Sequence, residues 1–513
     1  MSWSSSFIAE LNRPHTRRWY VSIDDRTNGY GDPWQAGSDP FLCPDPSVGV
    51  RNLQTQKQSL TPRTWETTLG GFSFEVVGEM GKSLAALVRG ALVYLYVGTE
   101  GMTPSQFERV AVGAIVDVEG RKGTRAIESL VVTVQDLPYA LQCRQTADIG
   151  AHPLFYQTSA TAALTAAEAV GSGTYNVDST ANFNRPTTGT YPYGYILVET
   201  DVGDAYYRRY SATTGTTFTI QDAATVGLVG TSDIGASDTN VIREAWGLRG
   251  HPLDIVRQLL VSRGDGLGGP YDVYPAGWGF RISEHLVDID DMSTFKASDI
   301  LTPASGSYEW EIAGVDKVED GWSWLSDLLT RGGFFLAMRQ GSVTCRPVQS
   351  PKGLRIHSGV NLDDNEIAEV LAYSAYDSRV SPEYYTIEVV TYTSGSFTDT
   401  SVTMSTLPAG NTYTYDQSDR IFNNGTAIAS VDLARLKFAV TTVPEVVRLR
   451  MAGLRCAQLT LGDIVTLSTR LCPARDGRGM YGRDCMVNGI RVEWVGGTVE
   501  LDLTVWPGGV GTQ

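Results

Sequence analysis

The chain has 513 residues, of which 42% are hydrophobic and 19% are charged, and its formal net charge is −16 at pH 7. This composition excludes a disordered chain and predicts about three or four folded domains. The acidic balance argues against a protein that holds nucleic acid by neutralising phosphates, but it is compatible with a channel through which DNA passes without adhering.

The start of the chain lacks a basic segment followed by a long apolar one. No apolar stretch approaches the roughly 18 residues that a membrane-spanning helix needs. We therefore expect a protein that folds in the cytoplasm and has no membrane span.

Residues 1–150 are predicted to form an N-terminal β-barrel-like domain. The chain holds 54 glycines and 24 tyrosines, a profile that favours turn-rich β-structure. Phe72, Phe74 and Val76 alternate with polar residues such as Glu75, and this period of two places the apolar side chains on one face of a strand. Short apolar runs follow one another through the whole region, at a spacing that is typical of a barrel or sandwich.

Residues 176–243 are predicted to form a small β-domain inserted into the larger protein. Three short apolar or aromatic runs, around Ile196, Tyr206 and Phe218, are separated by turn residues such as Gly215. No catalytic motif accompanies these runs. The placement suggests an assembly protein rather than an enzyme.

Residues 244–332 are predicted to form a small α/β central region with two helices. One helix is expected from His251 to Ser262, because Pro252 stands at its first turn and apolar residues recur at helical spacing. The second is expected from Gly321 to Arg331, where a glycine pair ends it. Both are too short to be stable alone, so they must pack on a sheet. The expected packing residues are Leu253, Val256, Leu260, Trp278, Trp322, Trp324 and Leu328.

Residues 333–513 are predicted to form a C-terminal β-barrel-like domain. Gln340 and Gly341 separate two apolar runs and predict a hairpin. Gly496 and Gly497 separate the last two runs of the chain and predict another. The expected fold class is therefore a β-rich, multidomain α+β protein.

The sequence holds no motif of a known catalytic or metal site. Its five histidines are scattered, and neither HExxH nor the nucleophile elbow GxSxG occurs. Its six cysteines form no CxxC pair, so spacing gives no support to a zinc or iron–sulfur site, and we expect buried reduced thiols. We predict no enzyme activity, no cofactor and no metal.

The acidic run from Asp288 to Asp291 has two interpretations. Its carboxylate oxygens could bind a hard cation such as Ca²⁺. The run lacks the glycine and the terminal glutamate of a helix-loop-helix calcium site. We predict a solvated turn.

Aromatic residues offer a different function, which is binding of glycans. Exposed tyrosine and tryptophan side chains can form a sugar-binding surface, whereas the same residue types are also favoured in β-cores and subunit interfaces. The candidates are Trp19, Trp34, Tyr191, Tyr193, Tyr206 and Tyr207.

Several segments together resemble the tail-tip (baseplate) hub proteins of long-tailed bacteriophages. A helix, a glycine-rich turn and a tryptophan-containing segment follow the inserted module, and this order is the most specific part of the resemblance. The end of the chain is similar to the closing barrel of such hubs. The matching segments are Tyr206–Ile220, His251–Leu260, Gly264–Asp272, Pro275–Gly279, Leu461–Leu467 and Met486–Val505.

The resemblance implies a homotrimer in which each chain holds two tail-tube-like β-barrel domains. Three chains would form a pseudo-sixfold ring that joins the sixfold tail tube or distal tail protein to threefold tip or fibre proteins. The ring would also contact the tape-measure protein and line the DNA exit channel, so that DNA is a partner only in transit. The implied location is the tip of a non-contractile tail in the virion.

The resemblance carries over no catalytic residue, because the role of a hub is architectural. Some tip proteins of long-tailed phages hold a cysteine-ligated iron–sulfur cluster. The dispersed cysteines depart from that pattern, so no cluster is assigned. Two rival functions stay open: a receptor- or glycan-binding tail protein acting through the inserted β-domain, and a tail-associated peptidoglycan hydrolase.

Overall fold

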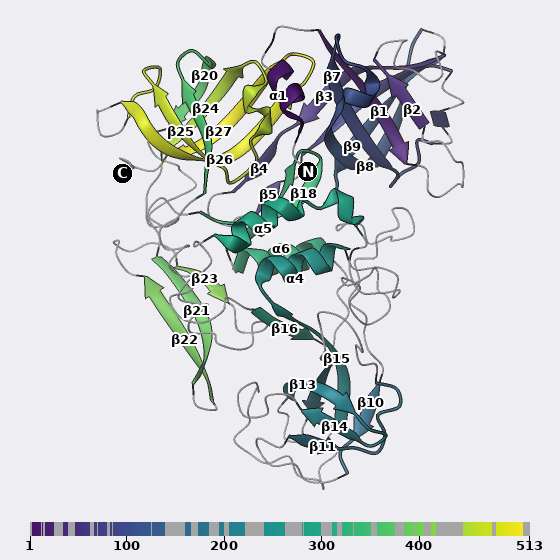
Figure 1. Cartoon of the computed structure of the whole chain (residues 1–513), viewed down its shortest axis with the longest axis vertical. Coiled ribbons are helices and arrows are strands. Elements are labelled where there is room, and N and C mark those ends of the chain that lie inside the picture. The colour runs from purple at the N-terminus through teal and green to yellow at the C-terminus, as the bar shows by residue number, and fades with distance from the viewer. Residues whose placement is uncertain are drawn as a thin grey trace.

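The computed structural model shows a β-rich chain with few helices (Figure 1). Two barrel-like sheets lie side by side at one end, a helical layer lies below them, and a smaller sheet forms the far end. The structure describes residues 3–11, 13, 16–24, 34–38, 47–61, 66–68, 70–79, 83–84, 86–124, 126–138, 160–165, 173–183, 194–199, 205–220, 241–261, 280, 282–298, 310–314, 321–331, 333–349, 356–374, 384–393, 396–404, 412–416, 445–474 and 479–505.

The first barrel-like sheet, the N-barrel, has seven strands in the order β2-β1-β7-β8-β9-β6-β3. Each pair of neighbours is antiparallel. The edge strands β2 and β3 contact each other, so the sheet curls back on itself. A 3-10 turn, η2 (Pro104–Gln106), precedes β8. The strands are β1 (Arg17–Asp24), β2 (Trp34–Gly37), β3 (Val48–Gln56), β6 (Gly71–Gly78), β7 (Leu92–Thr99), β8 (Glu108–Lys122) and β9 (Ile127–Asp136).

Alternation along β6 places the apolar side chains in the core of the N-barrel, as predicted. Phe72, Phe74 and Val76 are at most 1% exposed. Glu75 lies on the opposite face, yet it is also buried, and Arg51 Nε donates a hydrogen bond of 2.9 Å that compensates its buried charge. Hydrogen bonds from Arg51 and then Ser129 lower the pKa of Glu75 to about 2. A buried carboxylate needs such partners, and alternation alone cannot show them.

The second barrel-like sheet, the C-barrel, has a six-strand path in the order β19-β25-β26-β27-β24-β20. Its two edge strands are consecutive in the chain and are joined by a short turn at 364–366. Strands at opposite edges can be joined by so short a turn only if the sheet closes. The strands are β19 (His357–Asp363), β20 (Ile367–Ser374), β24 (Glu445–Ala452), β25 (Ile464–Thr469), β26 (Met480–Glu493) and β27 (Thr498–Val505), with a 3-10 turn, η6 (Arg455–Gln458), after β24.

The two barrels share one chain topology. In the N-barrel the order β3-β6-β9-β8-β7 places the first, second, fifth, fourth and third of these strands side by side. In the C-barrel the order β20-β24-β27-β26-β25 is the same, and all neighbours within both sets are antiparallel. The two halves of the chain therefore contain the same five-stranded unit.

The barrels are joined by an N-terminal helix and by an added strand. Helix α1 (Ser5–Leu11) lies between them (Figure 1), and the Trp3 ring meets the ring of Trp494 edge-on at 5.8 Å. Strand β4 (Gln58–Leu60) leaves the N-barrel and pairs with β26; it also pairs with β5 (Thr67–Thr68). Buried side chains of both barrels and of α1 form one continuous hydrophobic cluster.

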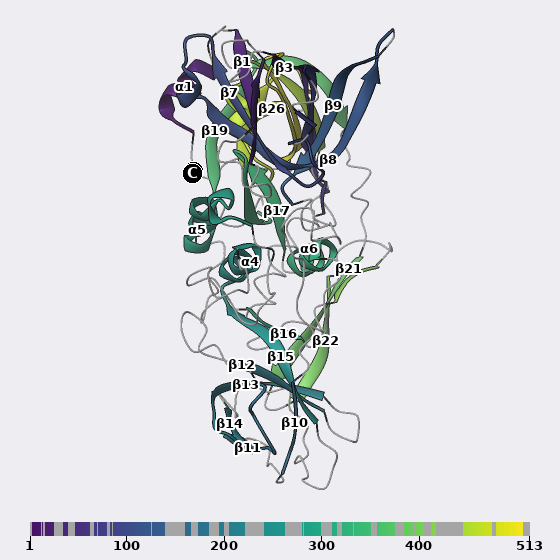
Figure 2. The same cartoon turned by 90° about the vertical axis from the view of Figure 1, so that its right-hand side faces the viewer.

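A layer of short helices and one hairpin lies below the barrels (Figures 1 and 2). The predicted helix at Pro252 and the predicted helix at Gly321 are both present, as is the predicted hairpin. Gln340 and Gly341 have φ of 50° and 73°, which is the left-handed geometry of a tight hairpin turn. The elements are α4 (Pro252–Val261), η4 (Glu284–Leu286), α5 (Ile289–Ala297), α6 (Gly321–Arg331), β17 (Phe334–Arg339) and β18 (Ser342–Pro347).

Most of the expected packing residues lie in the core of this layer. Leu253, Val256, Leu260 and Leu328 are buried in one cluster with Tyr94 and Val112 of the N-barrel. Trp324 is half-buried and packs against the same cluster. Trp278 lies outside the described residues, and of Trp322 the structure describes only the backbone, in α6. The cluster joins the helices to the outer face of the N-barrel.

The inserted module forms a separate sheet at the far end of the molecule (Figure 1). Its order is β10-β15-β12-β13-β14-β11, and β15 continues toward the helices, where it pairs with β16. The sheet spans Thr161 to Gly250, which is wider than 176–243, and the division of the chain into domains stays a prediction. The strands are β10 (Thr161–Ala163), β11 (Thr174–Asn176), β12 (Gly194–Glu199), β13 (Ala205–Thr213), β14 (Thr217–Ile220), β15 (Val241–Gly250) and β16 (Trp310–Gly314).

A further three-stranded sheet lies beside the helical layer (Figure 1). Its central strand β21 (Tyr384–Thr393) pairs antiparallel with β22 (Ser396–Met404) and parallel with β23 (Thr412–Asp416). These strands lie in the chain between β20 and β24 of the C-barrel.

Gly462 shows where the C-barrel needs glycine. Its φ is +83°, and a Cβ at this position would lie 2.5 Å from Cζ of buried Phe335. We expect Gly462→Ala to lower the free energy of unfolding by about 1–3 kcal/mol, since both the backbone and the packing become strained. The control is Gly497→Ala, which has a φ of +68° but no atom within 4 Å of the added Cβ. Equal losses in urea denaturation would show that Phe335 imposes no constraint.

Candidate functional site

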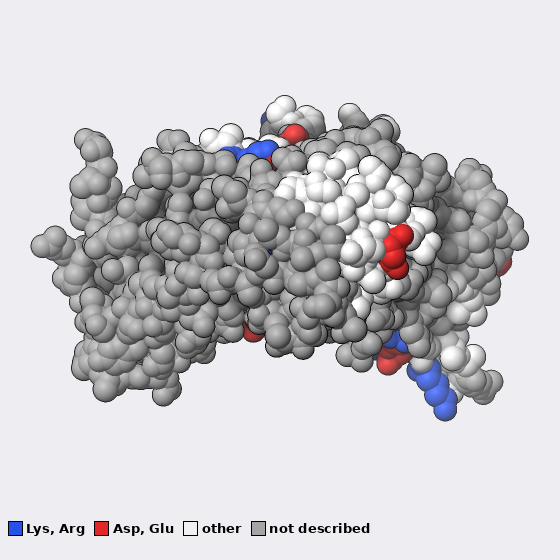
Figure 3. Space-filling model, turned by 90° about the horizontal axis from the view of Figure 1, so that it is seen from below, with Lys and Arg blue, Asp and Glu red and all other residues white. Residues whose placement is uncertain are grey.

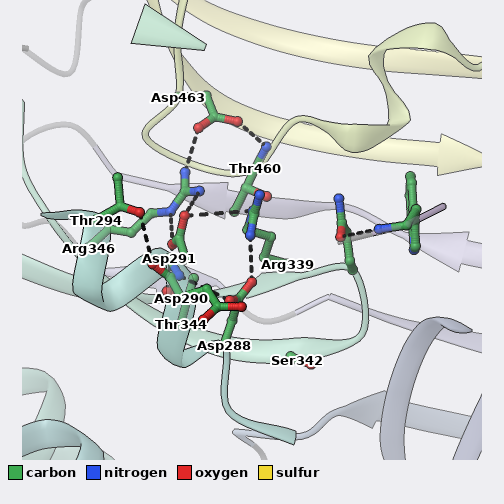
Figure 4. Close-up of polar contacts among 12 residues, drawn as sticks. Asp288, Asp290, Asp291, Thr294, Arg339, Ser342, Thr344, Arg346, Thr460 and Asp463 are labelled. Carbon is green, nitrogen blue, oxygen red and sulfur yellow. Dashed lines mark hydrogen bonds and ion pairs between the residues drawn. The ribbon is translucent and has the colours of Figure 1, made fainter. Parts of the chain in front are cut away.

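A buried network of carboxylates and guanidinium groups joins the helical layer to the C-barrel (Figure 4). Helix α5 provides Asp291 and, at its N-cap, Asp288, whose side chain accepts a hydrogen bond from the Asp291 backbone at 3.1 Å. The β17–β18 hairpin provides Arg339 and Arg346, one at each end of the hairpin. The loop before β25 provides Asp463.

Arg346 is the centre of this network. Its Nε and Nη2 donate to the two carboxylate oxygens of Asp291 at 2.7 and 2.8 Å, which is a bidentate pair. Its Nη1 donates to Asp463 at 2.6 Å and to the carbonyl oxygen of Leu461 at 3.2 Å. The Arg346 side chain is only 3% exposed, and four of its five N–H groups bond to protein oxygens in place of water.

A second ion pair lies beside the first. Arg339 Nη1 donates to Asp288 at 2.6 Å, and the Asp288 side chain is fully buried. Thr344 donates to Asp291 at 2.7 Å. Each buried carboxylate of the network therefore has a cationic partner, which a buried charge requires.

The electrostatics hold both members of the central pair in their charged forms. Burial opposes ionisation of Asp291, but the charge and hydrogen bonds of Arg346 outweigh it and lower the pKa of this carboxyl below its ordinary value. Burial likewise opposes the charge of Arg346, yet Asp463 and Asp291 raise the pKa of the guanidinium above its ordinary value. Both shifts favour the charged forms of the pair, which suits a contact that holds α5, the hairpin and the C-barrel together.

The prediction of a solvated turn at Asp288 to Asp291 was wrong. Asp288 is completely buried and Asp291 is 9% exposed, while Asp290 lies in the first turn of α5. The sequence did contain a signal for this helix start, because aspartate is favoured at the N-cap, where its side chain accepts a hydrogen bond from a backbone N–H of the first turn. Asp288 and Asp291 are related in this way. The two arginines that make burial tolerable lie about fifty residues further along the chain, out of reach of any local pattern.

A polar pocket of about 380 Å³ opens beside the network, between α5, β19 and the turn η6. Its lining includes Asp290, Thr294, Ser358 and Gln458 as well as the paired residues. Within the described part of the chain, no group of three or more histidine, cysteine or acidic residues could hold a metal ion. The carboxylates of this pocket that are buried already bind guanidinium groups, so the arrangement is suited to holding segments together.

A second polar contact lies where three parts of the chain meet. Asp136, at the end of β9, accepts hydrogen bonds from the Gly70 backbone at 2.8 Å and from Gln58 Nε2 at 3.1 Å. Gln58 belongs to the strand that pairs with the C-barrel, and its Oε1 accepts from the backbone of Met338 in β17 at 3.3 Å. Burial raises the pKa of Asp136 to about 7, although both hydrogen bonds act in the opposite direction.

We expect Asp136 to make stability depend on pH near neutrality. The unfolded carboxyl titrates near 4, so between about pH 4 and pH 7 the unfolded state binds fewer protons than the native state, and stability falls as the pH rises. Asp136→Asn cannot ionise. Between pH 5 and pH 8 the wild type should therefore lose about 1–3 kcal/mol of unfolding free energy that the variant does not lose. Asp363→Asn, at an exposed position, is the control; identical pH profiles for all three proteins would contradict the assignment.

The described cysteines are buried thiols. Cys345, Cys456, Cys472 and Cys485 form no disulfide, and burial raises the pKa of each. A thiol with a raised pKa is a poor nucleophile and a poor metal ligand. Cys43 and Cys143 lie outside the described residues.

Of the aromatic candidates for glycan binding, the structure describes the side chain of Trp19 alone. Trp19 is 4% exposed and lies in the core of the N-barrel, so it cannot contact a sugar. The side chains of Trp34, Tyr206 and Tyr207 are not described, and Tyr191 and Tyr193 lie outside the described residues.

No protein-family model matches the chain, and no curated protein sequence matches it. Among solved structures, it is similar to the 43 kDa tail protein of prophage MuSo2 from Shewanella oneidensis, with 10% identity over 95% of this chain and 98% of that one and a TM-score of 0.38. It is similar to a tail protein from Neisseria meningitidis, with 11% identity, coverages of 96% and 97%, and a TM-score of 0.40. It is also similar to prophage tail protein gp18 from Listeria monocytogenes, with 8% identity over 94% of each chain and a TM-score of 0.39. These TM-scores are too low to establish a shared fold.

None of the described helices is both long and apolar enough to cross a membrane.

Proposed function

We propose that the protein is a structural hub of a phage tail tip. Three copies would form a ring in which the N-barrels and C-barrels alternate, so that six similar barrels surround a central channel. Such a ring can match a sixfold distal tail protein and tail tube on one side and threefold tip or fibre proteins on the other. The tape-measure protein and, during ejection, the DNA would occupy the channel.

The observation that supports this proposal best is the five-stranded unit shared by the two barrels. A trimer presents only three copies of any one surface, whereas a trimer of chains with two equivalent barrels each presents six nearly equivalent ones. The joint between the barrels, made by α1 and β4, would fix the angle between two neighbours in the ring. The net charge of −16 suits a channel wall that repels DNA.

The test is the mass of the pure protein in solution, measured by light scattering over a range of concentrations. A mass of three times 55.7 kDa, with six densities around a ring in electron micrographs, is the expected result. A monomer at every concentration, both alone and with the distal tail protein added, would contradict the hub.

A receptor- or glycan-binding role of the inserted module is the second candidate. The module lies at the end of the molecule opposite the barrels (Figures 1 and 2), and the described side chains at that end are mostly neither acidic nor basic (Figure 3). Binding to host-surface glycans that disappears when residues 176–243 are deleted would favour this role. A hydrolase would instead degrade peptidoglycan as the pure protein.

A further inference from the structure

The two barrels correspond residue by residue, as their hydrogen-bond registers show. In the N-barrel the pairing of β8 with β9 shifts by one residue between Ile115 and Asp117. In the C-barrel the pairing of β26 with β27 shifts in the same way between Val487 and Gly489. Aligning the two shifts makes Asp117 the counterpart of Gly489.

Independent features support this alignment. The Gly90 backbone donates to the carbonyl oxygen of Ile115 at 2.8 Å, and the Gly462 backbone donates to that of Val487 at 2.8 Å. Gly90 and Gly462 have φ of 87° and 83°. Under the alignment Gly90 corresponds to Gly462, just as Ile115 corresponds to Val487. The correspondence therefore holds across neighbouring strands.

An ion pair also recurs, with its charges exchanged. Arg51 on β3 pairs with Glu75 on β6, and at the corresponding place Glu369 on β20 pairs with Arg450 on β24. The end of β20 therefore corresponds to the end of β3. Tyr373 pairs with Val447 as Thr55 pairs with Phe72, so Tyr373 is the counterpart of Thr55.

The joint inside the chain uses one outer surface of each barrel. Gly489 and Ile490 of β26 pair with β4, which follows β3 of the N-barrel. Arg491 Nε donates to the carbonyl oxygen of Thr55 at 3.0 Å, and Thr55 Oγ1 donates to that of Val492 at 2.5 Å. The end of β3 is thus bound to the edge of β26.

In the described part of the chain, no added strand covers the counterpart of this edge on the N-barrel. Asp117, Glu119 and Gly120 on β8 are exposed, and they correspond to Gly489, Arg491 and Val492. Beyond Ile115, no described strand pairs with β8 on the side of β7. The hairpin of β8 and β9 protrudes from the barrel (Figure 2), and Ile127 at its tip is 51% exposed. An unpaired strand edge of this kind readily accepts another chain.

We propose that this edge of β8, from Asp117 to Gly120, binds the C-barrel of a second copy of the chain at the end of its β20. The contact would repeat between copies the joint that β3, β4 and β26 make within one copy. It is a head-to-tail contact, because the surfaces at its two sides differ, and head-to-tail contacts close into rings when the rotation between copies allows it. The proposal rests on the proposed ring and names the surfaces that form it.

A pair of exposed cysteines tests the contact in the full chain. Glu119→Cys and Ser374→Cys, combined in one protein, should be joined between copies by a short bismaleimide, giving dimers and trimers but no larger species on a denaturing gel. The matched control is Arg491→Cys with Gln56→Cys, the counterpart pair at the joint within the chain. It should be joined within one copy, as peptide mass spectrometry would show. The wild type and the single variants control for reaction of the native thiols.

The mass of the same samples separates the two ways of failing. A trimer by light scattering with no crosslink between the thiols introduced at positions 119 and 374 would overturn this contact and leave the ring standing. A monomer without crosslinks at every concentration would overturn both. A ladder that continues past three copies would overturn ring closure, because an unclosed head-to-tail contact produces filaments.

Discussion

Arg346→Met is expected to lower the free energy of unfolding by about 3–5 kcal/mol, because removal of one partner leaves buried charges uncompensated. Asp291 and Asp463 both depend on this guanidinium, and Asp291 is 9% exposed. The control is Arg448→Met, since the Arg448 side chain is 49% exposed beside Asp502 and such pairs contribute about 1 kcal/mol or less. Urea denaturation of both variants is the measurement.

The loss should also depend on pH. The pKa of Asp291 is lowered in the native protein, so the stability it contributes is present above the ordinary pKa of a carboxyl and is lost as the pH falls through the lowered value. In Arg346→Met the same carboxyl would lose its bidentate partner and keep only the Thr344 hydrogen bond and Arg339 at 3.7 Å, so protonation would relieve part of the cost of burying it. The variant should therefore differ less from the wild type at pH 4 than at pH 8. An equal loss of stability for Arg346→Met and Arg448→Met at pH 8 would show that the buried network contributes no more than an exposed ion pair.

Phe7→Ala should be comparably destabilising, at about 3–5 kcal/mol. Phe7 is fully buried, its ring lies 5.4 Å from that of Trp3, and it belongs to the cluster shared by both barrels. Helix α1 has only seven residues and cannot be stable alone, so this packing holds it in place.

Ser6→Ala is the matched control for this variant, because Ser6 is exposed on the same helix. We expect it to change the stability by no more than about 0.5 kcal/mol. Thermal denaturation of the two variants compares them directly. If Phe7→Ala unfolded at the temperature of the wild type, packing of α1 would contribute nothing to the joint between the barrels.

Local sequence patterns were sufficient for elements whose contacts are close in the chain. Pro252 and the helical spacing after it predicted α4, and Gln340 with Gly341 predicted the hairpin of β17 and β18. The glycine pair at 496–497 likewise predicted the hairpin of β26 and β27. These predictions were right because a proline fixes φ and a glycine permits positive φ whatever the rest of the chain does.

The sequence by itself thus determined that this is a β-rich chain and located the two short helices α4 and α6 of the central region, but it missed α5. The tertiary structure decided what the acidic residues do. Asp291 and Arg346 are fifty-five residues apart, and Asp463 is more than a hundred residues further on, so their pairing depends on how distant strands meet. The sequence predicted two barrel-like domains, but their shared strand order and register were decided by the tertiary structure, because they reside in pairing and backbone angle rather than in residue identity.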